Sequence, residues 1–235
     1  MNVKPLVDHD WISRLIPPGS RVLDLGCGTG TLLAKLEHEK GVQGSGIEIS
    51  QDCIQACIAK GLPAIQADID EGLKDYPDDA FDFVILCRTL HLVHRPAYVL
   101  SEALRVGKHV IISFENEAHW KNRVRFLFSG EISLDNEPHD VLEQDHSRNY
   151  LTVKRLETLV QRMGIKIERR YFTRILHAGE VLFLPNARAW LALFVLTRND
   201  ALIATSTANK NDFETKKSEN IINKKCFTSI KPRLT

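Results

Sequence analysis

Short apolar runs alternate with amphipathic segments through the first half of this chain. Five segments are predicted strands, and they lie at residues 22–25, 43–49, 64–67, 81–86 and 110–114. The apolar run of the first is consistent with a strand buried on both faces of a sheet. Between them, apolar side chains recur at helical spacing from about residue 31, over 51–60 and over 96–106. Strands and helices that alternate in this order predict a doubly wound α/β fold with a mostly parallel sheet.

The pattern changes before and after this core. A short amphipathic helix over 11–16 precedes the first predicted strand. Residues 115–150 contain only short apolar runs, and we expect them to lie over the carboxyl ends of the strands as a lid. A helix over 152–163 and two last strands, near 166–171 and 189–197, complete the predicted fold.

Composition places the chain among ordinary globular proteins, since 43% of its 235 residues are hydrophobic and 26% are charged. The formal net charge of +1 gives no general attraction to nucleic acid or to a membrane surface. From about Asn199 the composition shifts to Lys, Asn, Ser and Thr, and few apolar residues remain. We therefore expect residues 1–198 to form one domain and residues 199–235 to form a disordered basic tail.

Two further features bear on the compartment. No apolar run approaches the roughly 20 residues of a membrane-spanning helix. The five cysteines are scattered and odd in number, without a metal-binding or redox spacing. Together these features predict reduced thiols in a cytoplasmic protein.

Three glycines at alternate positions follow the first predicted strand, in the pattern Asp24-x-Gly26-x-Gly28-x-Gly30. Glycine lets the backbone turn tightly and approach a ligand, and the helix after the turn offers free amides. The third glycine comes one residue earlier than in the dinucleotide-binding pattern. Asp24, a carboxylate at a strand end, suits a ligand ammonium group. Glu48 ends the second strand close to the roughly 20-residue offset expected for a ribose-binding carboxylate.

The glycine pattern resembles motif I of class I S-adenosylmethionine-dependent methyltransferases, and further strings resemble one branch of that fold, the methionine biosynthesis protein W (MetW) family. These strings lie at residues 18–33, 46–49, 66–73, 81–86, 104–107 and 119–120. The resemblance implies a Rossmann-like, doubly wound α/β sheet of seven strands, mostly parallel with an antiparallel last strand. Residues 130–133 and 147–149 depart from the family pattern, and both departures fall in the predicted lid.

The resemblance also implies S-adenosylmethionine or S-adenosylhomocysteine as the ligand, and it assigns roles to residues at the strand ends. Glu48 would accept hydrogen bonds from both ribose hydroxyls, and Ile49 would pack on the adenine. Asp68 and the Ile69 amide would meet the polar edge of the adenine. Cys87 would line the crevice near the sulfonium. The complete predicted cofactor-binding set is Asp24, Gly26, Cys27, Gly28, Gly30, Glu48, Ile49, Asp68, Ile69 and Cys87.

Two functions are compatible with this site. The resemblance implies an accessory protein of methionine biosynthesis that acts with homoserine O-acyltransferase. The alternative is a small-molecule S-adenosylmethionine-dependent methyltransferase, which would also need a catalytic group, for which His91 after the fourth strand is a candidate base. His91 and His94 lack an evident third ligand, so we expect no metal. We also expect no nucleic-acid or membrane partner.

Overall fold

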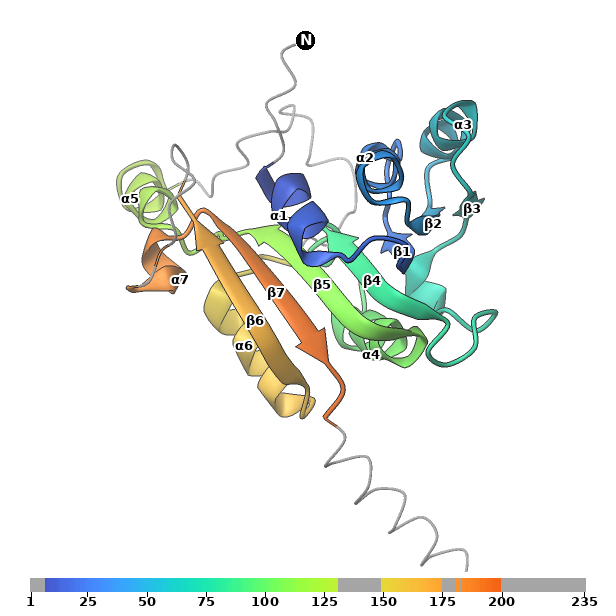
Figure 1. The fold of residues 1–235 in the computed structure, drawn as a ribbon. Helices are drawn as coiled ribbons and strands as arrows, with labels where there is room; N and C mark the ends of the chain where they lie inside the picture. The colour runs from blue at the N-terminus through green and yellow to red at the C-terminus, as the bar shows by residue number, and fades with distance from the viewer. Residues whose placement is uncertain (1–6, 131–148, 175–180, 182, 200–235) are drawn as a thin grey trace, which may run out of the picture. The chain divides into compact units, whose positions relative to one another are not determined.

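Seven strands form a sheet at the centre of the computed structural model, in the order β3-β2-β1-β4-β5-β7-β6 (Figure 1). The strands are β1 Arg21–Leu25, β2 Gln43–Glu48, β3 Ala64–Gln66, β4 Phe81–Cys87, β5 Gly107–Glu115, β6 Lys166–Thr173 and β7 Leu191–Thr197. β7 runs antiparallel to both of its neighbours, whereas β1 to β5 pair in parallel. This arrangement confirms the predicted seven-stranded, mostly parallel sheet with an antiparallel last strand.

Helices cover both faces of this sheet. They are α1 Val7–Leu15, α2 Thr31–Lys40, α3 Gln51–Ala59, α4 Pro96–Val106, α5 Trp120–Ser129, α6 Val153–Arg162 and α7 Pro185–Arg188, with a short 3₁₀ helix, η1 Ile69–Glu71, after β3. Figure 1 shows α1, α2 and α3 on one face and α4 and α6 on the other. Among the described residues, no helix is long and apolar enough to cross a membrane.

The structure describes residues 7–130, 149–174, 181 and 183–199. Two predictions made from the sequence therefore fall largely outside it. One is the basic tail over 199–235, of which the structure describes Asn199 alone, and the other is the greater part of the predicted lid, residues 131–148.

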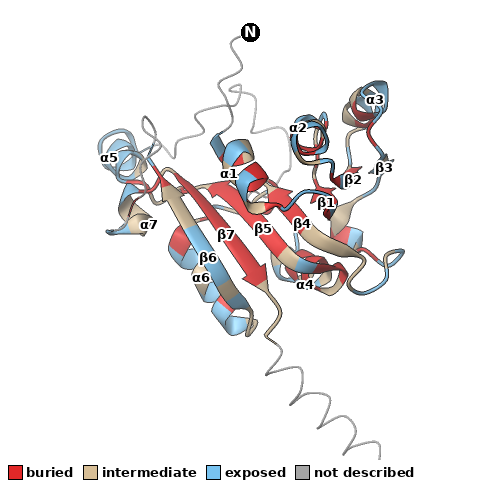
Figure 2. Cartoon of the chain, in the orientation of Figure 1, coloured by how far each residue is buried: buried red, intermediate tan, exposed pale blue. Residues whose placement is uncertain are grey.

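The apolar runs of the strands supply both halves of the core. In β4, Val84 and Leu86 join the cluster packed against α4 and α6, whereas Ile85 joins the cluster packed against α1 and α2. In β5, Ile112 likewise joins the cluster packed against α4 and α6, and Ile111 joins the cluster packed against α1 and α2. Successive side chains of a strand face opposite sides of the sheet, so a run without polar residues suits a sheet covered on both faces. Figure 2 shows the resulting burial of the central strands.

The sequence pattern missed three helical segments and the start of a fourth. The predicted helix over 11–16 begins at Val7, which brings Asp8 and Asp10 into its first turn. The segments α5, α7 and η1 were not predicted. α7 and η1 are short, whereas α5 lies in the segment that was interpreted as a lid and has no buried residue.

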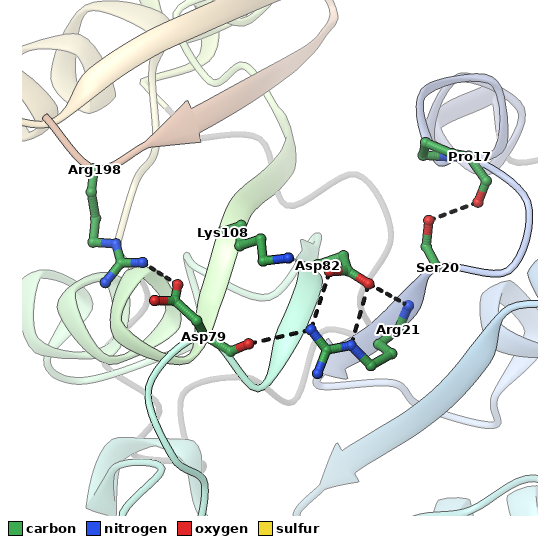
Figure 3. Close-up of polar contacts among 7 residues, drawn as sticks. All are labelled: Pro17, Ser20, Arg21, Asp79, Asp82, Lys108 and Arg198. Atoms are coloured by element: carbon green, nitrogen blue, oxygen red, sulfur yellow. Dashed lines mark hydrogen bonds and ion pairs between the residues drawn. The ribbon is translucent and has the colours of Figure 1, made fainter. Parts of the chain in front are cut away.

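Charged side chains tie several strands together at their amino ends (Figure 3). Arg21, at the start of β1, donates from Nη2 to Asp82 Oδ1 at 3.2 Å, and Lys108 Nζ donates to the same oxygen at 2.9 Å. The hydrogen bonds from Arg21, and then that from Lys108, hold the pKa of Asp82 well below its usual range. Arg198, just after β7, pairs with Asp79. The glycine turn follows the other end of β1, so this cluster stabilises the sheet away from the predicted site.

Candidate ligand-binding site

Asp24 lies near the carboxyl end of β1, where it is opposite Gly46 of β2 and Ile85 of β4. Only 1% of the residue is exposed, and among the described residues none donates a hydrogen bond to its Oδ1. Burial, and then the negative charge of nearby Glu48, raise the pKa of Asp24 to about 7. Buried polar atoms in folded proteins are nearly always hydrogen-bonded, so Oδ1 is an acceptor with unused capacity.

The turn after β1 is held by its neighbours through backbone contacts. The amides of Gly26 and Cys27 both donate to the Ile47 carbonyl, at 2.8 and 3.1 Å. A Cβ on Gly26 would lie 2.5 Å from the Thr89 side chain, and its φ of +74° already favours glycine. Glycine at this position therefore lets the turn pack closely against the loop after β4.

Gly28 differs from Gly26 because its Cβ position faces open space. Its φ is +52°, and a Cβ built there would meet no atom within 4 Å. Packing against neighbours in the described part of the chain therefore does not require glycine at this position. The open side of the turn is where a ligand could approach the backbone.

Glu48, at the end of β2, joins the glycine turn to the segment that leads into α3. Its Oε2 accepts from the Gly28 amide at 2.9 Å, and its Oε1 accepts from the amides of Ile49 and Ser50 at 2.9 and 3.0 Å. A carboxylate offers about four acceptor positions, so these three bonds leave roughly one for a ligand hydroxyl. Glu48 thus positions the turn, a role that its place at a strand end did not reveal.

Cys27 helps to pack the glycine turn against α3. Its thiol lies 4.0 Å from that of Cys57 on α3, and Cys57 Sγ donates to the Gly28 carbonyl at 3.2 Å. Burial, and then the charge of Asp24, raise the pKa of the Cys27 thiol above its usual range. Both thiols are free and buried, so they act as small apolar groups that pack the turn against α3.

The predicted adenine-side residues lie after β2 and β3. Ile49 is 64% exposed, an unusual position for a large aliphatic side chain beside a buried strand end. Asp68 accepts from the Asp70 amide at 2.8 Å and so caps η1. The side chain of Ile69 packs against the core cluster on the α4 side of the sheet. The sequence placed these residues at the correct strand ends but did not predict the cap.

Asp70 is a buried carboxylate that the sequence reasoning did not single out. It accepts from the amides of His94 and Arg95, each at 2.8 Å, and from His94 Nδ1 at 3.3 Å. Burial raises its pKa, but these hydrogen bonds outweigh that effect and leave the pKa of Asp70 below its ordinary value. Asp70 therefore ties η1 to the loop after β4. A second carboxylate two positions after Asp68 was the only signal in the sequence.

Cys87, at the end of β4, lies beneath α1. Its thiol donates to Asp8 Oδ2 at 3.6 Å and accepts from Ser113 Oγ at 3.3 Å. Burial, and then the charge of Asp8, raise the pKa of the Cys87 thiol above its usual range. Arg88 Nε donates to the same Asp8 oxygen at 2.6 Å, and Arg88 Nη1 donates to Glu115 at 2.9 Å. α1 and the ends of β4 and β5 are therefore joined by a partly buried ion pair.

Replacing Asp8 with Ala is expected to lower the free energy of unfolding by about 2–4 kcal/mol, because it leaves the partly buried Arg88 without its main partner. Urea denaturation would measure this loss. Asp10→Ala is the control, since it removes an exposed ion pair with Lys35 on the same helix and should cost under about 1 kcal/mol. Equal losses for the two variants would contradict a special role for the Asp8–Arg88 pair.

The same region contains three potential metal-ligating groups. The ligand atoms of Asp8, His9 and Cys87 lie within 4.8 Å of one another. The Asp8 carboxylate is already paired with the Arg88 guanidinium, whose positive charge would oppose a cation there. The loop that carries His91, the candidate base, is held by a bond from the Asn149 amide to the His91 carbonyl at 2.9 Å. The role of His91 stays a prediction.

The structure thus brings together Asp24, the glycine turn and Glu48 by direct contacts and charge. Asp68 and Ile69 follow β3, which is the neighbour of β2. Cys87 ends β4, which is the neighbour of β1. These residues therefore lie at the carboxyl ends of parallel strands, which is where open α/β sheets bind ligands.

Comparisons with known proteins agree with this geometry. A family model described as methionine biosynthesis protein MetW matches residues 6–196. A relative from Rhodopirellula baltica, named bifunctional methionine biosynthesis protein MetXA/MetW, is 34% identical over 179 residues, which are 71% of this chain and 28% of that protein. The chain therefore spans little more than a quarter of that relative's length.

Solved structures show the same fold at low identity. A SAM-dependent methyltransferase from Archaeoglobus fulgidus has a TM-score of 0.58 at 19% identity, covering 82% of this chain and 93% of its own. The [4+2]-cyclase SpnF also has a TM-score of 0.58, at 15% identity, covering 82% of this chain and 80% of its own. One of these proteins is named as a methyltransferase and the other as a cyclase, so this fold alone does not decide the reaction.

Proposed function

This chain belongs to the methionine biosynthesis protein MetW family, and from that premise we propose that it binds S-adenosylmethionine or S-adenosylhomocysteine and acts with homoserine O-acyltransferase. The observation that carries the ligand proposal is the buried Asp24 Oδ1, which has no donor among the described residues. An ammonium group is a donor of the right charge for a carboxylate in such a position.

The rest of the crevice fits the same ligand. Gly28 leaves the turn open for close approach, and Glu48 keeps about one acceptor position for a ribose hydroxyl. Ile49 offers an exposed apolar surface on which an adenine ring would pack. Asp24 and Glu48 together make the crevice acidic, which favours a ligand that carries an ammonium and a sulfonium.

When bound, S-adenosylmethionine supplies an activated methyl group on its sulfonium. The thiol of Cys87 is a poor acceptor for that group, because its raised pKa keeps it protonated and it is already bonded to Asp8 and Ser113. Its position suits packing beside the ligand. This favours a binding role, which the accessory function requires, over a reaction at the sulfur of Cys87.

The partner proposal rests on the family and on the Rhodopirellula relative, whose name joins MetXA and MetW in one polypeptide. A linker in one chain keeps two domains at a high effective concentration. In separate chains, the same cooperation requires a direct interface. We therefore propose that this chain and homoserine O-acyltransferase bind one another.

Co-expression of the two proteins is expected to give a complex that elutes as one peak in size-exclusion chromatography at micromolar concentration. The run is made with and without S-adenosylmethionine, so that any dependence on the ligand is seen. Separate elution under both conditions would contradict the partner proposal. Calorimetry on the chain alone tests the ligand proposal separately, so failure of the partner proposal would not decide it.

A further inference from the structure

A second cavity lies on the α4 and α6 face of the sheet, outside the glycine-turn crevice. Its volume is about 670 Å³, within the range of small-molecule sites. It is lined by Leu90, Pro96, Ala118, Asn149, Leu151, Thr152, Lys154, Arg155, Thr158, Leu159, Arg162 and Asn186. None of these residues belongs to the predicted cofactor-binding set.

The charged side chains among the described lining residues all have the same sign. They are Lys154, Arg155 and Arg162 from α6, and none of the described lining residues is a carboxylate. In the described part of the chain, none of these three cations has a carboxylate within ion-pair distance. Glu157, the acidic residue of the same helix, is paired instead with Arg170 at 3.4 Å. Among the described residues, the Arg155 guanidinium donates only to the Tyr150 carbonyl, at 3.4 Å, which leaves most of its donors available.

The same cavity also has apolar lining. Leu90 follows β4, Pro96 begins α4, Leu151 precedes α6 and Leu159 lies on α6. Leu90 belongs to the larger core cluster, so this part of the lining is continuous with the packed interior. A cavity lined by both cations and aliphatic carbon matches an anionic group attached to an apolar chain.

The walls are also fixed relative to one another. Asn149 donates from Nδ2 to the Val93 carbonyl at 2.7 Å, which ties the approach to α6 to the loop after β4. The Lys154 amide donates to Asn186 Oδ1 at 3.2 Å, which ties α6 to α7. Segments far apart in the sequence are thus held around the same space, which lowers the cost of ordering them on binding.

We propose that this cavity binds a small anionic molecule with an apolar chain, whose carboxylate or phosphate group contacts Lys154, Arg155 and Arg162. The ligand differs in charge from the one proposed for the acidic crevice at Asp24 and Glu48. The two sites therefore prefer ligands of opposite charge, and a molecule bound in one does not compete for the other. This inference does not depend on the interaction with homoserine O-acyltransferase.

The test uses the full-length, ¹⁵N-labelled protein and three probes with the same six-carbon chain: hexanoate, hexyl phosphate and hexan-1-ol. At least one anion is expected to give saturable amide shifts at Leu90, Thr158 and Arg162, and hexan-1-ol is not. A stronger response to hexanoate indicates a carboxylate ligand, whereas a stronger response to hexyl phosphate indicates a phosphate ester.

The double variant Arg155→Gln/Arg162→Gln should weaken binding of the preferred anion by roughly tenfold, because it removes two of the three cations in the described lining. Arg169→Gln on β6 is the control, since it removes one exposed charge outside the cavity and should leave affinity unchanged. Lys154→Gln tests the third cation separately. Absence of saturable shifts with both anions, equal shifts with hexan-1-ol, or equal weakening by the control would overturn the proposal.

Discussion

Replacing Asp24 with Asn is expected to make the free protein more stable than the wild type above pH 7, while impairing its binding of S-adenosylmethionine. In the unfolded chain Asp24 loses its proton near its ordinary pKa of 3.8, but in the folded protein it does so at about 7. Between these values only the folded state holds the proton, so wild-type stability falls as pH rises. The Asn side chain does not titrate and escapes this loss.

The size of the effect follows from the pKa. Because one pKa unit corresponds to about 1.4 kcal/mol, the difference between variant and wild type should grow by at most roughly 4 kcal/mol from pH 4 to pH 7 and stay constant above. Urea denaturation across this pH range measures it. The comparison at low pH is the internal control, because both side chains are neutral there. If the difference in the free energy of unfolding does not change with pH, the pKa of the buried Asp24 is not raised.

The same variant should lose about ten- to a hundredfold in affinity for S-adenosylmethionine, since a hydrogen bond to a charged group is worth about 1.5–3 kcal/mol. Titration calorimetry at pH 8 would measure the loss. Wild-type affinity should also rise as pH increases towards 7, because the ligand ammonium favours the ionised carboxylate. If NAD binds the wild type and S-adenosylmethionine does not, the ligand has been misassigned.

Replacing Gly28 with Val is expected to abolish binding of S-adenosylmethionine while leaving the fold intact. The φ of +52° makes a side chain there cost roughly 1–2 kcal/mol of stability. A Cβ there meets no protein atom within 4 Å, so the branched side chain of Val is expected to fill the open side of the turn, where we propose that the ligand approaches. Calorimetry should therefore show no heat of binding, although thermal unfolding remains cooperative.

Gly19 provides a matched control for this substitution. Its φ is +72°, a Cβ there also meets no atom within 4 Å, and it lies before β1, away from the crevice. Gly19→Val should cost a similar amount of stability and retain ligand binding. If both variants lose binding, backbone strain explains the result and the open side of Gly28 is not the ligand's approach.

Local pattern was enough to predict the main strands and helices and the turn that follows β1. Uninterrupted apolar runs such as 81–86 predict strands covered on both faces, and side chains such as Val84 and Ile85 divide between the two core clusters as that pattern requires. The spacing of Asp24, Gly26 and Gly28 places a turn at a strand end. Each of these inferences depends on neighbours along the chain, and a single sequence records those directly.

Tertiary structure alone decided which of these side chains already have hydrogen-bond partners within the protein. Glu48 and Asp24 are both acids near strand ends, yet Glu48 accepts from three amides, whereas Asp24 Oδ1 has no donor in the described part of the chain. Cys87 is covered because α1 brings Asp8 to it from 79 positions away. The basic cavity joins residues near 90 to residues near 160 in the same way. Such contacts depend on how crossover helices pack on the sheet, and no local periodicity encodes the partners that this packing brings together.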